Sequence, residues 1–118
     1  MAVTGIGGLF FRASDPKALK AWYQTHFGMV PPGWTPWEQQ AGPTVFNPFA
    51  ADTDYWPAGK QWMLNLRVTD IDDMIAALRG AGVEVTTKAE WDSPEVGRFA
   101  RLYDPEGNPI ELWQPAED

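Results

Sequence analysis

The chain has 118 residues, no cysteine and a formal net charge of −7. This length fits one domain, and the absence of cysteine excludes disulfides and thiolate catalysis. The chain is acidic and has no run of Lys or Arg, which excludes an ordinary nucleic-acid partner. No apolar run approaches the roughly 18 residues of a membrane helix and the start lacks the pattern of a signal peptide, so we expect a cytoplasmic protein without membrane contact.

A strand followed by a helix is predicted at the start of the chain. Alternating apolar side chains favour a strand over residues 4–13. Asp15 and Pro16, an N-cap residue and a proline suited to the first helical turn, indicate where the helix begins. Gly28 ends it, and apolar residues at spacings of three and four give it one buried stripe, namely Leu19, Trp22, Tyr23 and Phe27.

The pattern is looser between residues 29 and 60. Prolines and glycines interrupt short runs, so we predict weak strands at residues 29–30 and 34–40 and a better one at residues 44–49. Residues 50–60 are predicted to form a connecting loop, which carries two aromatic side chains in a polar setting, Tyr55 and Trp56.

The opening pattern then returns. Residues 62–68 are predicted to form a strand, and Asp70 is predicted to cap a helix that ends at Gly80. Three further strands are expected at residues 83–88, 97–103 and 109–113, with a turn at residues 104–108.

The two halves are therefore interpreted as a repeat. The segment Arg12–Asp15 aligns with Arg67–Asp70 without a gap, and both helices end at glycine. Each half gives a strand, a helix and about three strands, with module one at about residues 4–50 and module two at about residues 61–114. Neither module buries its helix and sheet alone, so we expect the two to pack together.

These segments resemble the vicinal oxygen chelate superfamily, which includes glyoxalases, bleomycin-resistance proteins and dioxygenases. The most specific part is the stretch from Asp104 to Trp113, DPEGNPIELW. The resemblance implies one glyoxalase-like α+β domain over residues 1–118, in which two βαβββ modules form a curled mixed sheet around a cavity. It also implies a homodimer.

Strand alternation indicates which side chains face the cavity. Residues of each strand that do not face the helices point to the concave side, giving a set that is mostly aromatic with a few polar groups, as in small-molecule pockets. Trp56 of the loop and Met63 are added to this set as candidate binding residues. Alternatively, the concave side of the sheet is simply exposed to solvent, and its arginines are hydrated. The inward set is Phe10, Arg12, Phe46, Asn65, Arg67, Phe99, Arg101, Tyr103, Glu111 and Trp113.

A metal centre is not expected. The resemblance places the metal ligands of related proteins at Gly8, about Phe46, Met63 and Glu111, and among these only Glu111 is a suitable ligand for a divalent ion. His26, near the end of the first helix, suits a helix-end or edge-of-core role better than a ligand role. We therefore predict no metal and no cofactor.

Three functions remain open at this stage. The first is a protein that binds a planar or hydrophobic organic molecule by stacking, with Arg67 and Arg101 orienting an acidic or carbonyl group. The second is a glyoxalase-type lyase or isomerase, in which Glu111 is the catalytic general base or a metal ligand and Arg67 or Asn65 stabilises an enolate oxygen. The third is a structural module without a ligand. The sequence does not identify the substrate.

Overall fold

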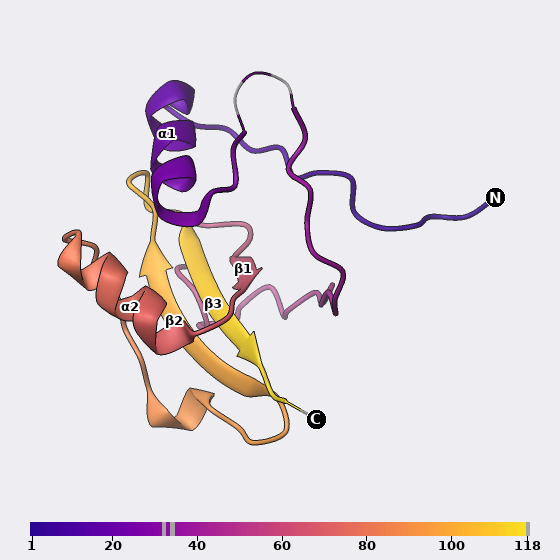
Figure 1. Cartoon of the computed structure of the whole chain (residues 1–118). Helices are drawn as coiled ribbons and strands as arrows, with labels where there is room; N and C mark the ends of the chain where they lie inside the picture. The colour runs from indigo at the N-terminus through magenta and orange to yellow at the C-terminus, as the bar shows by residue number, and fades with distance from the viewer. Residues whose placement is uncertain (32, 34, 118) are drawn as a thin grey trace.

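Strands are confined to the second half of the chain in the computed structural model, which describes residues 1–31, 33 and 35–117 (Figure 1). No helix in these ranges is long and apolar enough to cross a membrane. The elements follow in the order α1 (Pro16–Phe27), β1 (Leu64–Arg67), α2 (Ile71–Gly80), a short 3-10 helix η1 (Ala89–Trp91), β2 (Gly97–Tyr103) and β3 (Pro109–Pro115).

The three strands of the described chain form one open mixed sheet in the order β1-β3-β2. β1 runs parallel to β3, and β2 runs antiparallel to β3. The predicted strand at residues 97–103 is confirmed at both ends, and the predicted turn joins β2 to β3. Because β3 is central, its residues 110–113 have a paired neighbour on both sides.

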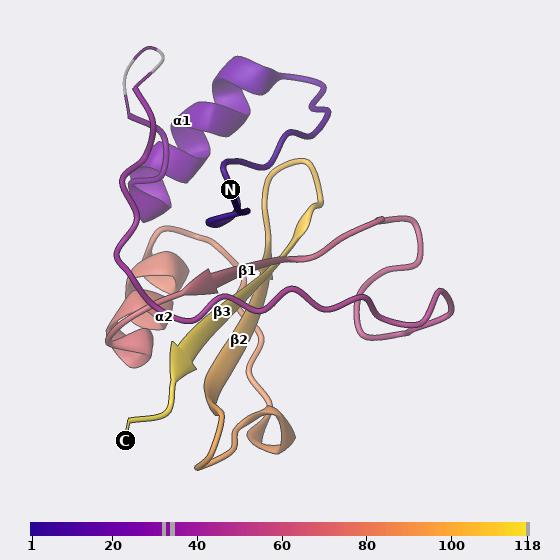
Figure 2. The same ribbon diagram turned by 90° about the vertical axis from the view of Figure 1, so that its right-hand side faces the viewer.

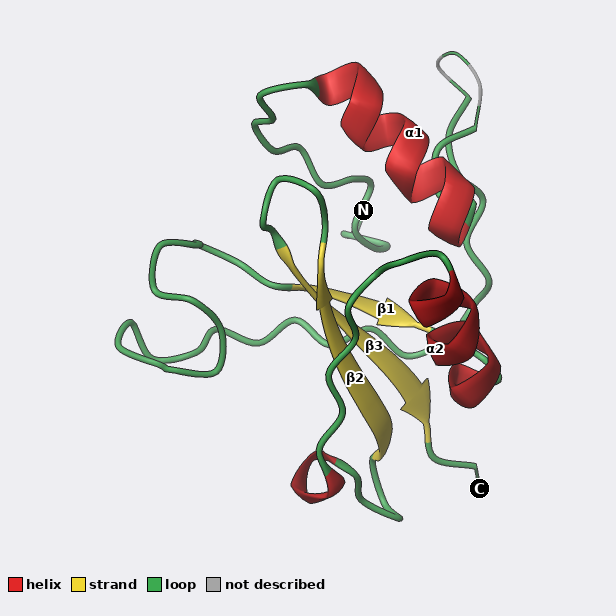
Figure 3. Cartoon of the chain, turned by 90° about the vertical axis from the view of Figure 1, so that its left-hand side faces the viewer, coloured by secondary structure: helices red, strands yellow, loops and turns green. Residues whose placement is uncertain are grey.

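One face of the sheet forms the core with the two helices. α2 lies against this face beside β3 (Figure 3). Burying each large side chain here stabilises the fold by about 1.5–3 kcal/mol. The alternation expected from the sequence is confirmed, since the core includes Leu66, Ala100, Leu102, Ile110 and Leu112 from the strands, with Leu19, Tyr23, Ile71, Ile75 and Leu78 from the helices.

Local sequence determines both ends of α1, as predicted. The Asp15 side chain accepts a hydrogen bond from the Ala18 amide at 3.1 Å, and Pro16 is the first helical residue. Gly28 adopts a left-handed conformation with φ of 66°, and its amide donates to the carbonyl of Gln24 at 3.0 Å.

α2 begins where the sequence predicts, but with a different cap. Asp70 is the N-cap residue, yet its φ is 51° and its side chain makes no capping hydrogen bond. The amide of Ile71 instead donates to the side-chain oxygen of Gln114, on β3, at 2.8 Å. An unpaired amide at a helix start can donate to any suitable acceptor, so here an oxygen from the sheet replaces the local cap.

The turn at residues 104–108 holds α1 against the sheet through a buried carboxylate. Asp104 accepts hydrogen bonds from the Tyr23 hydroxyl at 2.7 Å and from the amide and side-chain nitrogen of Asn108 at 3.0 and 2.8 Å. Burial and the hydrogen bond to Asp104 raise the pKa of Tyr23 above its usual value. One carboxylate therefore shapes the turn and anchors the helix.

A second acidic residue of the same turn binds the start of α1. The carboxylate of Glu106 accepts hydrogen bonds from the amides of Ser14 at 2.6 Å and Asp15 at 3.0 Å. A negative charge at the N-terminal end of a helix is favourable. The stretch identified as a turn in the sequence is thus also the attachment point of α1.

The strands predicted before β1 do not form in this structure. Residues 4–13, 29–30 and 44–49 contain no strand, and the weak strand predicted at 34–40 begins at Trp34, which lies outside the described residues. Figure 2 shows the chain before α1 and between α1 and β1 as extended segments. A strand requires a neighbour for its backbone hydrogen bonds, and these segments have no paired strand in the described chain.

The strand predicted at residues 83–88 does not form as a full strand. It contributes a single bridge between Thr86 and Arg101 at the outer edge of β2. The chain is thus a small mixed α/β protein with two helices and an open sheet in its described part, consistent with a glyoxalase-like fold. The division into two βαβββ modules stays a prediction.

Candidate functional site

The face of the sheet opposite the core carries the side chains predicted to point inward. Side chains alternate along a strand, so residues between the core positions share this face. Glu111 of β3 is paired in register with Asn65 of β1 on one side and with Arg101 of β2 on the other. We call this surface the site face, and its residues are Asn65, Arg67, Phe99, Arg101, Tyr103, Glu111 and Trp113.

Glu111 is the buried centre of the site face, with 7% of its surface exposed. One carboxylate oxygen, Oε1, accepts a hydrogen bond from Asn65 Nδ2 at 2.7 Å. The other, Oε2, accepts a hydrogen bond from the hydroxyl of Tyr55. Two donors therefore hold the carboxylate in one orientation and compensate for its burial.

Tyr55 reaches Glu111 from the loop formed by residues 50–60, which we call the 50–60 loop. Its ring stacks on Phe49 with centroids 5.8 Å apart and an interplanar angle of 13°, and meets Trp91 edge-on at 6.5 Å. Burial and the hydrogen bond to Glu111 raise the pKa of Tyr55 to about 12. The phenol therefore keeps its proton at neutral pH and acts as a donor.

Arg101 is buried beside this pair, with 8% of its surface exposed. Its Nη2 donates to the carbonyl of Tyr55 at 2.8 Å, and its guanidinium carbon lies 4.9 Å from the centre of the Tyr55 ring and 5.7 Å from that of Trp91. Its Nε is buried and has no hydrogen-bond partner within the described residues. Such an unsatisfied donor is unusual in a folded protein.

Arg67 holds another part of the chain on the site face. Its guanidinium donates to the backbone carbonyls of Gln40, at 2.8 Å, and Pro43. A side chain at Gly42 would bring its Cβ within 2.8 Å of the Arg67 guanidinium carbon, so the two pack tightly. In this arrangement Arg67 binds the chain between α1 and β1, which crosses the sheet in Figure 2, rather than facing an open cavity.

Phe99 and Trp113 form a stacked aromatic surface on the site face. They are paired across β2 and β3, and their rings stack with centroids 6.4 Å apart and an interplanar angle of 7°. Trp113 Nε1 donates to the carbonyl of Val96 at 2.9 Å, which fixes the ring. Both side chains are half-buried, so part of this surface stays open to a planar molecule.

The other predicted site residues lie outside this cluster. Trp56 donates to the carbonyl of Lys60 at 2.9 Å within the 50–60 loop, and Met63 is half-buried just before β1. Arg12 is exposed, as are Phe10 and Phe46, at 96% and 88%. The expected convergence of these last three on Glu111 does not occur here, because their segments are not paired into the sheet.

Two residues of the site are not predicted by the sequence pattern. The pattern predicts Trp56 rather than Tyr55 as a binding residue, and it predicts no role for Trp91 of η1. An aromatic residue in a polar loop is the available signal for Tyr55, but nothing local distinguishes it from Trp56. Trp91 is separated from Glu111 by the whole of β2 in the chain, so its position near Tyr55 depends on tertiary packing.

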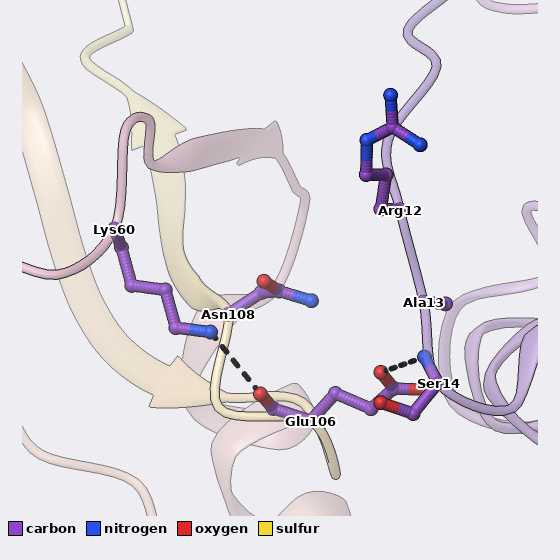
Figure 4. Close-up of a pocket in the computed structure, with 6 residues that line it drawn as sticks. All are labelled: Arg12, Ala13, Ser14, Lys60, Glu106 and Asn108. Atoms are coloured by element: carbon purple, nitrogen blue, oxygen red, sulfur yellow. Dashed lines mark hydrogen bonds between the residues drawn. The ribbon is translucent and has the colours of Figure 1, made fainter.

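Two surface hollows lie away from Glu111. The larger, about 370 Å³, is lined by Arg12, Ala13, Ser14, Lys60, Glu106 and Asn108 (Figure 4). Within it Lys60 Nζ donates to the carbonyl of Glu106 at 3.3 Å. The smaller, about 210 Å³, lies between residues 9–13 and α1. Neither hollow is lined by Glu111, whose carboxylate is covered by Tyr55.

The residues at the implied metal positions do not fit a metal ion. Gly8 has no side chain, and Phe46 and Met63 offer neither nitrogen nor oxygen. Glu111 already accepts two hydrogen bonds. In the described ranges no three His, Cys, Asp or Glu side chains lie close enough together to hold an ion, and zinc requires at least three protein ligands. His26 packs beside Trp22 within α1, with ring centroids 5.0 Å apart.

Comparisons with known proteins agree with this architecture. Residues 8–113 match a family described as a glyoxalase-like domain. The chain is also similar to the crystal structure of TnmS3, an antibiotic binding protein from Streptomyces sp. CB03234, with 28% sequence identity and a TM-score of 0.60. The match covers 98% of this chain and 99% of that one. No curated protein matches the chain.

Proposed function

We propose that this chain, which belongs to the glyoxalase-like domain family of the vicinal oxygen chelate superfamily, binds a small organic molecule on its site face without a resident metal ion. The observation that carries the proposal is the group around Glu111, where a carboxylate, an amide and a guanidinium lie side by side on one sheet face. A few converging polar groups beside aromatic rings are typical of small-molecule sites. Similarity to an antibiotic binding protein supports the same class of function.

The stacked pair Phe99 and Trp113 supplies the apolar part of the proposed site. Their rings are parallel and half-buried, and they lie on the same strands as Arg101 and Glu111. A planar ligand that stacks there gains apolar burial worth about 25 cal/mol per Å². The polar groups then determine which planar molecules bind.

The proposed functional unit is a homodimer in which a second copy completes the cavity. The accessible surface is 9004 Å², whereas a compact monomer of 13.2 kDa is expected to expose roughly 6,400 Å². The surface exposed beyond that expectation is large enough to form an obligate interface. It includes Leu9, Phe10, Val45 and Phe46, which lie on the segments that were expected to be strands. Pairing with a second copy would give these segments the neighbours they lack.

An enzymatic function is the alternative proposal. Glu111 would act as the general base of a lyase or isomerase on a carbonyl substrate. Both of its oxygens accept hydrogen bonds in this structure, so that role requires Tyr55 to leave first. A loss of turnover with retained binding in Glu111→Gln would support it.

Equilibrium dialysis with 2-methoxynaphthalene, a neutral planar aromatic ether, tests the binding proposal. We expect saturable binding that weakens at least fivefold in Phe99→Ala and in Trp113→Ala, because each removes half of the stacking surface. Trp22→Ala on α1, a tryptophan on the core side of the sheet, serves as the matched control and should bind as the wild type does. Absence of saturable binding, or equal loss in all three folded variants, contradicts the proposal.

A further inference from the structure

We infer, resting on the proposed small-molecule function, that the ligand of the site face is a hydroxyaromatic compound whose phenol replaces Tyr55 on Glu111. The chain itself supplies the first argument. A phenol, that of Tyr55, already occupies the hydrogen-bonding position on Glu111 Oε2 and lies over the guanidinium of Arg101.

The carboxylate of Glu111 selects for a hydroxyl donor. Its Oε1 is bound to Asn65 at 2.7 Å, so a ligand competes with Tyr55 for Oε2. A ligand that displaced Tyr55 without a donor would leave a buried charged acceptor unpaired, which is costly. A phenol satisfies the acceptor, whereas its methyl ether does not and a carboxylic acid adds a second negative charge.

The surroundings of the Tyr55 ring select for an aromatic hydroxyl rather than an aliphatic one. The ring lies 4.9 Å from the Arg101 guanidinium carbon and stacks on Phe49 at 5.8 Å. Trp91 meets it edge-on at 6.5 Å. A cation and two aromatic side chains around one ring favour an electron-rich aromatic occupant.

Arg101 adds a second requirement. Its Nε is buried without a hydrogen-bond partner, and Arg101 lies directly opposite Glu111 in the sheet register. Departure of the Tyr55 ring would uncover the guanidinium on which it lies. An acceptor oxygen carried by the ligand, such as a ring carbonyl, would then satisfy Nε. The inferred class is therefore a neutral hydroxyaromatic compound with an acceptor oxygen.

Tyr55 is held in a way that allows exchange with a ligand. The 50–60 loop has its own hydrogen bonds, from Trp56 Nε1 to the Lys60 carbonyl at 2.9 Å and from the Lys60 amide to the Pro57 carbonyl at 3.0 Å. These two bonds lie within the loop, and the bond from Arg101 Nη2 to the Tyr55 carbonyl involves only the Tyr55 backbone. The Tyr55 side chain can therefore turn away from Glu111 while all three bonds remain. The intramolecular phenol thus competes with the ligand.

Calorimetric titration with 2-naphthol and 2-methoxynaphthalene, at a pH where the naphthol is protonated, tests this class. We expect the wild type to bind the naphthol about tenfold tighter than the ether, since one hydrogen bond to a charged group has that effect. Tyr55→Phe keeps the ring and removes the competing hydroxyl, so it should tighten naphthol binding about three- to tenfold. Tyr23→Phe, which removes a phenol hydroxyl on the core side of the sheet, should change neither affinity.

The outcomes separate the ligand class from the binding function. Equal affinity for the two compounds in wild type and Tyr55→Phe, or weaker naphthol binding in Tyr55→Phe, overturns the hydroxyaromatic class and leaves small-molecule binding standing. Binding of neither compound overturns both. Glu111→Gln should abolish the preference for naphthol over the ether. If that variant does not fold, the comparison of Tyr55→Phe with wild type decides alone.

Discussion

Glu111 lies between two core residues, Ile110 and Leu112, and yet its carboxylate is buried on the opposite face of the sheet. Such a charge is tolerated in a protein only when it has partners. Asn65 is a neighbour fixed by the sheet register, whereas Tyr55 comes from a loop 56 residues away in sequence. The site therefore combines one donor from the sheet with one donor from a loop, which is the basis of the proposed ligand exchange.

The two hydrogen-bonded tyrosines predict a loss of stability at alkaline pH. The pKa values of Tyr23 and Tyr55 are raised above 10.0 by burial and by hydrogen bonds to carboxylates. The folded chain holds these two protons more tightly than the unfolded chain does, which stabilises the fold. This stabilisation is complete below pH 10. It is lost as the pH rises further, because the unfolded chain releases its tyrosine protons at a lower pH than the folded chain does. We expect the free energy of unfolding to fall as the pH rises from 10 to about 12.

Chemical denaturation followed by tryptophan fluorescence across that interval checks this prediction. The fall should be less steep in Tyr23→Phe and in Tyr55→Phe than in the wild type. Tyr103→Phe, which removes an exposed hydroxyl, provides the comparison and should retain the wild-type slope. A wild-type slope in both of the first two variants would show that these phenols do not control the pH dependence.

At the scale of elements, α1 is attached to the rest of the fold by its N-terminal end and by two buried side chains. Leu19 and Tyr23 contact the core, and Glu106 binds the amides of Ser14 and Asp15. α2 is instead packed along β3, and its first amide, that of Ile71, donates a hydrogen bond to Gln114. The two helices, similar in sequence pattern, therefore depend on different parts of the sheet.

We predict that Glu106→Ala loosens α1 without affecting α2. Loss of the two hydrogen bonds at the helix start should cost about 1 kcal/mol, which is less than the roughly 1.5–3 kcal/mol typical of one hydrogen bond to a charged group, because the site is exposed. Hydrogen exchange measured by mass spectrometry should become faster in α1 and stay unchanged in α2. Glu95→Ala, which removes only a local bond to Ser93, is the control. Equal exchange of α1 in both variants would refute the role of Glu106.

At the scale of the whole molecule, the chain is expanded for its size. Its radius of gyration is 15.0 Å, compared with roughly 13.5 Å for a compact domain of this length. The extended segments before β1 account for this shape, as Figures 1 and 2 show. Exposed apolar side chains on these segments, such as Phe10 and Phe46, are the basis of the proposed homodimer.

The proposed homodimer predicts twice the monomer mass of 13.2 kDa in solution. Light scattering during size-exclusion chromatography measures it directly. The double variant Phe10→Ser with Phe46→Ser should shift the protein toward the monomer, because both side chains are almost fully exposed in one chain and would be buried between two. Val96→Ser, at an exposed position after η1, should leave the mass unchanged. A monomeric wild type would refute the dimer.

The sequence by itself determined the features that depend on near neighbours in the chain. Asp15, Pro16 and Gly28 specify the ends of α1, because capping and left-handed backbone are local preferences. The strict alternation of side chains along a strand likewise predicts that Asn65 and Glu111 share a face opposite the core.

Tertiary structure decided the contacts between residues that are far apart in sequence. The donor on Glu111 is Tyr55 rather than a neighbouring ring, the cap of α2 comes from Gln114, and the segments expected to be strands before β1 are unpaired. Each depends on which elements pack together, and a strand in particular exists only where another backbone completes its hydrogen bonds.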